Sequence, residues 1–194
     1  MSHAASAEAG VYPRWREASF PQVGVRERPE RQATMAEPNI LLTRIDNRLI
    51  HGQVATQWNS SIGANLILVA NDDVSTNKMR QSLMDMAAPS GVATRYFSIQ
   101  KTIDVIHKAS PRQHIFIVVE SPEDVLRLVE GGVPIKKVNI GNMHMAEGKR
   151  QVATSVAVDD EDVAAFRKLQ EKGVELEIRR VPSTPAEDID KLFS

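Results

Sequence analysis

Residues 44–54 bring together side chains that suit the handling of a phosphoryl group. The stretch reads Arg44-Ile-Asp-Asn-Arg-Leu-Ile-His-Gly-Gln-Val54 and follows a short apolar run, so we predict a loop that leads into a helix. Guanidinium groups and the unpaired N–H groups of a helix start both bind phosphate oxygens. Because these positive charges also favour a neutral imidazole, His51 is a candidate phosphoryl acceptor, with Arg44 and Arg48 as candidate phosphate ligands.

The same loop fits two other kinds of function. An α/β module without catalytic activity would use residues 44–51 to bind a sugar phosphate or another small anion. Alternatively, His51 would act as a general base on a bound substrate, which requires a deep pocket that the sequence does not outline. The carrier and the anion-binding module differ at His51, since only the carrier loses all phosphoryl transfer when this side chain is removed.

The composition of the 194-residue chain argues against several other classes of function. It holds 24 Lys and Arg against 25 Asp and Glu, a net charge of −1, so we do not expect nucleic acid as a partner. With no cysteine and five scattered histidines it shows no pattern of metal ligands, and we expect neither a metal nor another cofactor. No apolar run approaches the roughly 18 residues of a membrane span, and the lack of cysteine fits a reducing compartment, so we expect a cytoplasmic protein.

Short apolar runs alternate with amphipathic stretches from residue 39 onward, which is typical of an α/β protein. Strands are predicted at 40–42, 66–69, 92–97, 115–119, 138–140, 152–158 and 174–181, and a helical pattern passes through Val54 and Trp58. Further helices are predicted near 76–87, 99–109, 122–130 and 160–172, with a short C-terminal helix signalled at 184–187. Strands apolar on both faces and joined by crossovers of about a dozen residues predict a single α/β domain, with a mostly parallel sheet of about seven strands and helices on both faces.

The first 34 residues lack this periodicity. They hold prolines scattered among Arg and Glu, so we expect a disordered tail, which a start codon assigned too early or an expression leader would also explain. The folded domain is then expected over residues 35–194.

Three further residues are candidates for the same edge of the sheet, because ligands of open α/β sheets bind at the carboxyl ends of the strands, where the strand order reverses. Asp72 follows the second strand and would orient His51, contact a partner protein or cap the next helix. Gly141 follows the fifth strand. It would either allow a turn that requires a positive φ or line this end of the sheet. His144 either assists the phosphoryl site or is a solvent-exposed bystander.

Two other patterns are given structural interpretations. Six residues separate Gly141 from Gly148, and Arg150 stands where a phosphate loop has Ser or Thr, so we reject nucleotide binding. The four acidic residues at 159–162 are expected at a helix N-terminus from the helix dipole alone.

The motif at residues 44–54 closely resembles the active-site signature of IIB components of the mannose/fructose/sorbose class of bacterial sugar phosphotransferase systems. The similarity covers nearly all of residues 38–193 and continues through Val69-Ala-Asn-Asp72, Ala87-Ala-Pro89, Gly131-Gly-Val133, Asn139-Ile-Gly-Asn-Met-His144 and Gly173-Val174 to Val181-Pro182. Residues 141–149 look most like the N-acetylgalactosamine or galactosamine branch of that class.

The resemblance implies a cytoplasmic phosphocarrier, a protein-Nπ-phosphohistidine–sugar phosphotransferase. Such a carrier takes a phosphoryl group from the histidine of a IIA domain and passes it to a sugar held by the membrane subunits IIC and IID, which it contacts only peripherally. His51 matches the phosphorylated histidine of the family, and Arg48 matches the arginine thought to steady the phosphoryl group. The resemblance gives Arg44 and Asp46 a part in shaping the loop. Asn47 stands where many members have Asp or Glu.

Overall fold

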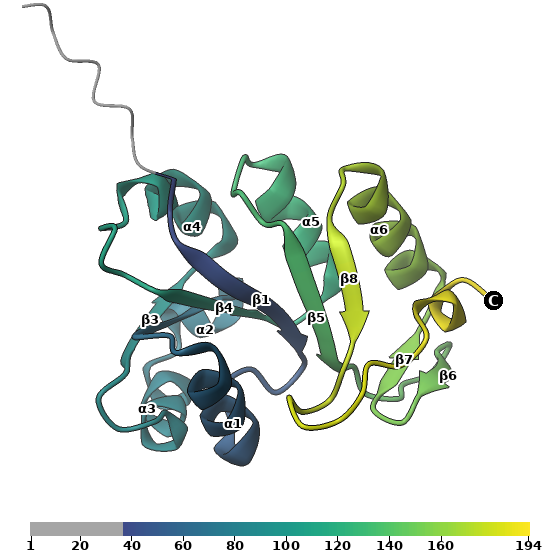
Figure 1. Cartoon of the computed structure of the whole chain (residues 1–194), viewed down its shortest axis with the longest axis horizontal. Helices are drawn as coiled ribbons and strands as arrows, with labels where there is room; N and C mark the ends of the chain where they lie inside the picture. The colour runs from purple at the N-terminus through teal and green to yellow at the C-terminus, as the bar shows by residue number, and fades with distance from the viewer. Residues whose placement is uncertain (1–36) are drawn as a thin grey trace, which may run out of the picture. The chain divides into compact units, whose positions relative to one another are not determined.

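The computed structural model describes residues 37–194, and the tail expected at 1–34 lies outside them. Its central sheet has six strands, all parallel to their neighbours (Figure 1). Across the sheet they are β3 (Ala93–Phe97), β2 (Leu66–Ala70), β4 (Ile115–Val119), β1 (Ile40–Asp46), β5 (Lys137–Asn142) and β8 (Glu175–Ile178). The prediction of an α/β domain built on a parallel sheet is confirmed.

Helices cover both faces of this sheet, as predicted. One face packs against α1 (Gly52–Ile62), α2 (Asp72–Thr76) and α3 (Lys78–Ala87), and the other against α4 (Ile99–Val105), α5 (Pro122–Glu130) and α6 (Asp160–Glu171). Each face has its own cluster of buried apolar side chains. Because β2 and β4 lie between the two clusters, all of their residues are buried, which explains their unbroken apolar sequences.

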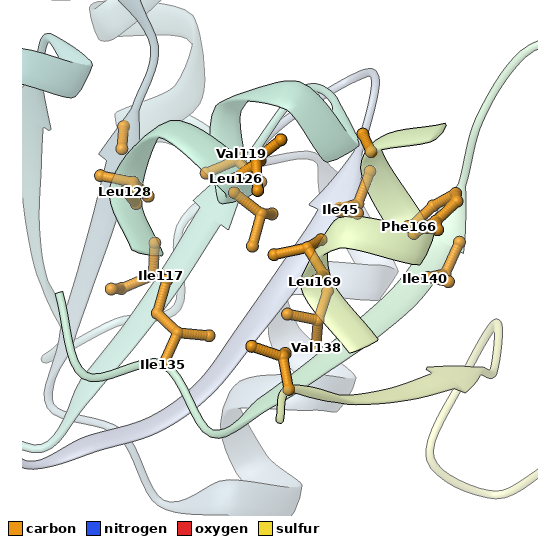
Figure 2. Packing of buried hydrophobic residues seen from close by; sticks show 14 of the residues in the cluster. Ile45, Ile117, Val119, Leu126, Leu128, Ile135, Val138, Ile140, Phe166 and Leu169 are labelled. Atoms are coloured by element: carbon orange, nitrogen blue, oxygen red, sulfur yellow. The ribbon is translucent and has the colours of Figure 1, made fainter. Parts of the chain in front are cut away.

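The larger cluster lies between the sheet and helices α5 and α6. Figure 2 shows Ile117 and Val119 of β4 and Val138 of β5 among the side chains of these helices. Phe166 and Leu169 of α6 are both fully buried there, three residues apart on one face of the helix. Truncating either side chain to alanine is expected to cost about 3–5 kcal/mol, so this cluster is a main source of the stability of the domain.

Two predicted elements are wrong. The apolar run 152–158 is not one strand of the sheet, because Thr154 and Ser155 form a turn inside it. The run instead belongs to an antiparallel hairpin of β6 (Arg150–Ala153) and β7 (Val156–Val158). The sheet therefore has six strands and not seven.

The helix predicted from residues 184–187 is also absent from the described structure. The backbone N–H of Glu187 donates to Ile178 O at 2.8 Å, which keeps this segment extended along the end of β8. A short 3-10 helix follows instead at Ile189–Leu192, and its first turn is capped by Asp188.

Helix α5 begins as its sequence predicts. Ser121 caps it by accepting from the backbone N–H of Asp124, and Pro122 occupies the first turn. The carboxylate of Asp124 is only 15% exposed. Burial is the main cause that raises its pKa to about 6, with a further contribution from Glu120.

This raised pKa predicts how stability depends on pH. Asp124 has a folded-state pKa above its unfolded value near 3.9, so the folded chain binds this proton more tightly, and stability decreases as the pH rises from about 4 to 6. We expect Asp124→Asn to raise the free energy of unfolding at pH 7.5 by about 1–3 kcal/mol, with the gain disappearing near pH 4. Urea unfolding of both chains at pH 4, 5.5 and 7.5 measures this, and a gain that does not vary with pH would contradict it.

Candidate functional site

The loop between β1 and α1 lies at a switch in strand order, as predicted. β1 is a central strand, and the chain runs from it through α1 to β2 on one side of β1, whereas β5 and β8 lie on the other side. Loops at such a position are open to ligands, because the connections leave in opposite directions. Figure 1 shows β1 running toward the end of the sheet where α1 begins.

A buried ion pair anchors this loop. Arg44 is only 1% exposed, and its Nη2 lies 3.0 Å from Oδ2 of Asp46, which is also fully buried. Arg44 is paired in register with Asn139 of β5, and its Nη1 donates to the Oδ1 atom of Asn139. Burial lowers the pKa of Arg44 and the charge of Asp46 opposes that shift, and an arginine keeps its proton in a folded protein.

The same guanidinium ties the end of β8 to the end of β1. It donates to the carbonyl oxygens of Arg179 and Arg180 at 3.2 and 3.3 Å. Trp58 of α1 lies beneath it, 5.4 Å from Cζ to the ring centroid, and its Nε1 also donates to Arg180 O. All terminal nitrogens of Arg44 are therefore engaged within the fold. Direct binding of phosphate by Arg44 is not supported, whereas a part in shaping the loop is.

Gly141 is required by the close approach of Arg44 and not by its own backbone angles. The predicted positive φ is wrong, because Gly141 lies within β5, at an irregularity where Ile45 pairs with Ile140 but Asp46 pairs with Asn142. A Cβ atom at residue 141 would lie 1.8 Å from the Cζ atom of Arg44. Only glycine leaves room for the pinned guanidinium.

The second carboxylate oxygen of Asp46 holds the turn that follows. Oδ1 accepts from the backbone N–H of Arg48 at 3.2 Å and lies 3.5 Å from Nε of the same residue. It also lies 3.8 Å from Nδ1 of His51. The backbone N–H of Leu49 donates to Asp46 O at 2.9 Å, which completes a tight turn.

His51 is oriented by a strained neighbour. Its Nδ1 lies 2.9 Å from Leu49 O, and because a carbonyl only accepts, Nδ1 is the donor of this hydrogen bond. Nε2 is buried and has no hydrogen-bond partner among the described residues. Leu49 has a φ of 57° and is the only non-glycine residue of the described part with a positive φ. Its side chain is buried in the core. This packing holds a conformation that costs a leucine of order 1 kcal/mol or more.

Arg48 is the arginine of the loop that faces solvent, with 46% of its side chain exposed. It borders two open hollows. One is polar and includes His144, Ser155 and Arg180. The other includes His51, with Arg80 and apolar side chains of α3.

His144 is brought to the loop, but Asp72 is not. The backbone N–H of His144 donates to Oδ1 of Asn47, whose Nδ2 donates to Glu120 O at 3.1 Å, so Asn47 ties three loops together. Asp72 instead accepts from Ile99 N and from Arg127. It is not the helix cap either, because Asn71 caps α2.

Sequence reasoning missed several residues of this site. Arg180 and Arg80 lie far from the motif in sequence and carry no local pattern. The buried Asn139 did leave a signal, since a polar amide stands between two buried apolar residues of a strand, which indicates a buried partner. The strain at Leu49 depends on tertiary packing, so a single sequence cannot show it.

These groups suit the transfer of a charged group between proteins. The site offers the imidazole of His51, the exposed guanidinium of Arg48 and the start of α1, in open hollows that also contain His144, Arg80 and Arg180. The deep pocket that general-base catalysis would need is not formed here by the described residues. Within residues 37–194 no group of three His, Asp or Glu side chains converges as metal ligands, and no helix is long and apolar enough to span a membrane.

Comparison with known proteins gives a consistent result. The family described as "PTS system sorbose subfamily IIB component" matches residues 40–194. The N-acetylgalactosamine-specific phosphotransferase enzyme IIB component 2 of Escherichia coli is 52% identical over 156 residues, which cover 80% of this chain and 99% of that protein. The crystal structure of the N-acetylgalactosamine-specific IIB component 1 of E. coli matches with a TM-score of 0.76 at 49% identity, over 78% of this chain and 99% of that one.

A mannose-specific EIIAB component of E. coli is also similar. It is 42% identical over 145 residues, which cover 74% of this chain and 45% of that protein.

The close approach at residue 141 gives a prediction on stability. In Gly141→Ala the new methyl group must displace a buried guanidinium that makes four hydrogen bonds, so we expect a loss of about 3 kcal/mol or more. In an Arg44→Lys background, where no planar fork lies over residue 141, the same substitution should cost about 1 kcal/mol or less. Urea unfolding of the four chains completes this double-mutant cycle, and equal costs in both backgrounds would show that the clash with Arg44 is not the cause.

Proposed function

The chain belongs to the sorbose subfamily of IIB components of phosphotransferase systems, and we propose that His51 is the residue on which it carries its phosphoryl group. IIB components are phosphocarriers that work with a IIA domain and with membrane subunits. The observation that carries the proposal is the position of His51. It lies at the start of α1, in a loop fixed by the buried Arg44–Asp46 pair and next to the exposed Arg48.

In the proposed reaction, a ring nitrogen of His51 attacks the phosphorus of a phosphohistidine on the IIA domain. The N–P bond of the donor breaks as the new N–P bond forms, and the donor histidine leaves as an imidazole. Such a transfer depends mainly on positioning and on neutralising the phosphoryl oxygens. Arg48 can place its guanidinium against these oxygens, and the first N–H groups of α1 add further donors.

The resting position of His51 sets a condition on this reaction. Nδ1 donates to Leu49 O, and Nε2 is buried. For Nδ1 to become the phosphorylated nitrogen, the ring must leave the Leu49 carbonyl and the proton must move to Nε2. Because the bond to Leu49 O is the one hydrogen bond that the ring makes within the described residues, this step costs about one hydrogen bond.

An amino sugar is the proposed final acceptor. The relatives that are 52% and 49% identical to this chain over nearly their whole lengths are named as N-acetylgalactosamine-specific. The phosphoryl group would pass from His51 to N-acetylgalactosamine or galactosamine held by membrane IIC and IID subunits, with this chain on the cytoplasmic side. The absence of a deep pocket in the described residues is consistent with a sugar that is bound by the partner.

The alternative is a module that binds a sugar phosphate or small anion at residues 44–51 without covalent chemistry. Arg48 and the start of α1 would serve that function as well. The two functions separate at His51, because one charge-assisted hydrogen bond to an anion contributes only about 1–3 kcal/mol, whereas a carrier without its histidine transfers nothing.

Intact-protein mass spectrometry tests the proposal. The natural chain and His51→Ala are each incubated with phosphoenolpyruvate, the general phosphotransferase proteins and a cognate IIA domain. We expect an acid-labile gain of one phosphoryl group on the natural chain and none on His51→Ala. Membrane vesicles that carry the IIC and IID subunits, with N-acetylgalactosamine, should then remove the label.

His107→Ala is the matched control, because this histidine lies in the 3-10 helix at Ile106–Lys108, away from the loop. It should be labelled like the natural chain. If the natural chain takes no label although the IIA domain is shown to be phosphorylated, the proposal that His51 carries the phosphoryl group is wrong. Anion binding is then the favoured function.

A further inference from the structure

Helix α3 presents a row of apolar side chains to solvent. Met79, Leu83 and Met86 are 77, 61 and 84% exposed, and only one other large apolar side chain of the described residues, Met145, is comparably exposed. Their spacing of four and three residues places them on one face of the helix. We call these three side chains the α3 stripe.

The α3 stripe is not needed to hold the helix in place. The opposite face of α3 does that, with Met84 buried in the core and Gln81 donating to Val74 O at 2.7 Å. Asp85 adds hydrogen bonds from the hydroxyls of Thr94 and Tyr96. Three large apolar side chains kept in water without a packing role are typical of a surface that binds another protein.

The stripe is continuous with the phosphoryl site. Leu83 lines the hollow that also contains His51 and Arg48. Arg80 and Ala87 lie on the side of α3 that faces this hollow. A protein that brings a reactive group to His51 would therefore extend over α3.

The charges around the hollow favour one of the two partners. Arg48 is half exposed, and the guanidinium of Arg80 has no ion-pair or hydrogen-bond partner among the described residues. Unphosphorylated His51 beside these cations is the state that must accept a phosphoryl group, so its matching partner brings negative charge. That partner is the phosphorylated IIA domain. The membrane subunits instead meet this chain after His51 is phosphorylated, when its own phosphate already neutralises these cations.

We propose that the α3 stripe, with Arg80 at its edge, is the docking surface for the phosphorylated IIA domain. This inference rests on the proposed role of His51. Methionine side chains are flexible and adapt to partners of different shape, which suits an interface that must form and separate at every turnover. The IIA surface that fits it has apolar side chains next to its phosphohistidine and acidic groups at its rim.

The test measures the initial rate of phosphoryl acceptance as a function of the concentration of charged IIA domain. Leu83→Glu and Met86→Glu place a carboxylate in the stripe. We expect each variant to need about tenfold more IIA domain for half-maximal rate, and the double variant to need more. At saturating IIA domain all of them should reach one phosphoryl group per chain. Leu83→Met, which keeps an apolar side chain, should behave as the natural chain does.

A matched control is Gln170→Glu, which adds the same charge to an exposed position of α6 on the other face of the sheet. It should accept the phosphoryl group at the natural rate. Urea unfolding should show the stripe variants to be as stable as the natural chain, because the replaced side chains are exposed.

The outcomes separate this inference from the proposed function. If the natural chain is labelled and the double variant is labelled equally fast at every IIA concentration, the proposed docking surface is wrong. The proposed role of His51 is then unaffected. If acceptance from IIA is unchanged but transfer to the membrane subunits is slowed, the stripe binds the membrane partner and the assignment to IIA is overturned. A natural chain that takes no label would overturn the role of His51 itself.

Discussion

The loop between β1 and α1, where we propose that the phosphoryl group is carried, depends on one buried ion pair, Arg44 with Asp46. Taking both charges out of water costs several kcal/mol per ion, and the fold offsets this by giving the guanidinium four hydrogen bonds and an aromatic face. Buried pairs of this kind contribute little net stability. Instead, this pair joins β1, β5 and β8 at the carboxyl ends of these strands, where the loop begins. The glycine at residue 141 follows from it, because no side chain fits beneath the guanidinium.

The two arginines of the motif have separate tasks. Arg44 is engaged entirely inside the fold, and Arg48 stays half exposed beside His51. Asp46 connects them, since one of its oxygens binds Arg44 and the other accepts from the backbone of Arg48. The buried residues thus hold the loop in place, while its outer surface is open to solvent. If His51 carries the phosphoryl group as proposed, the partner protein supplies the other half of the transfer site over the open hollows on either side of Arg48.

Much of this could be predicted from the sequence, and the failures have physical causes. The apolar runs of β2 and β4 were recognisable because strands buried on both faces have no polar positions. The prediction of one strand at 152–158 is wrong, because periodicity does not show a two-residue turn inside an apolar run. Arg44 could be found as a member of the site, but its burial could not, because that depends on Asn139 and the carbonyls of residues 179 and 180, which are distant in sequence. The position of Asp72 after a strand predicts either a role at His51 or a helix cap, and only the packing of α5 shows that it binds Arg127 instead.

The most direct test of this account is the rate of phosphoryl acceptance by Arg44→Lys at saturating IIA domain. Lysine keeps the charge opposite Asp46, so the chain should still fold, which far-ultraviolet circular dichroism would establish. An ammonium cannot reach Asn139 and both carbonyl groups at once, so the loop should lose its fixed geometry. The account predicts a rate at least about tenfold lower than that of the natural chain, the equivalent of about 1.4 kcal/mol in the barrier. A folded Arg44→Lys chain that accepts the phosphoryl group at the natural rate would contradict the claim that the buried pair positions His51.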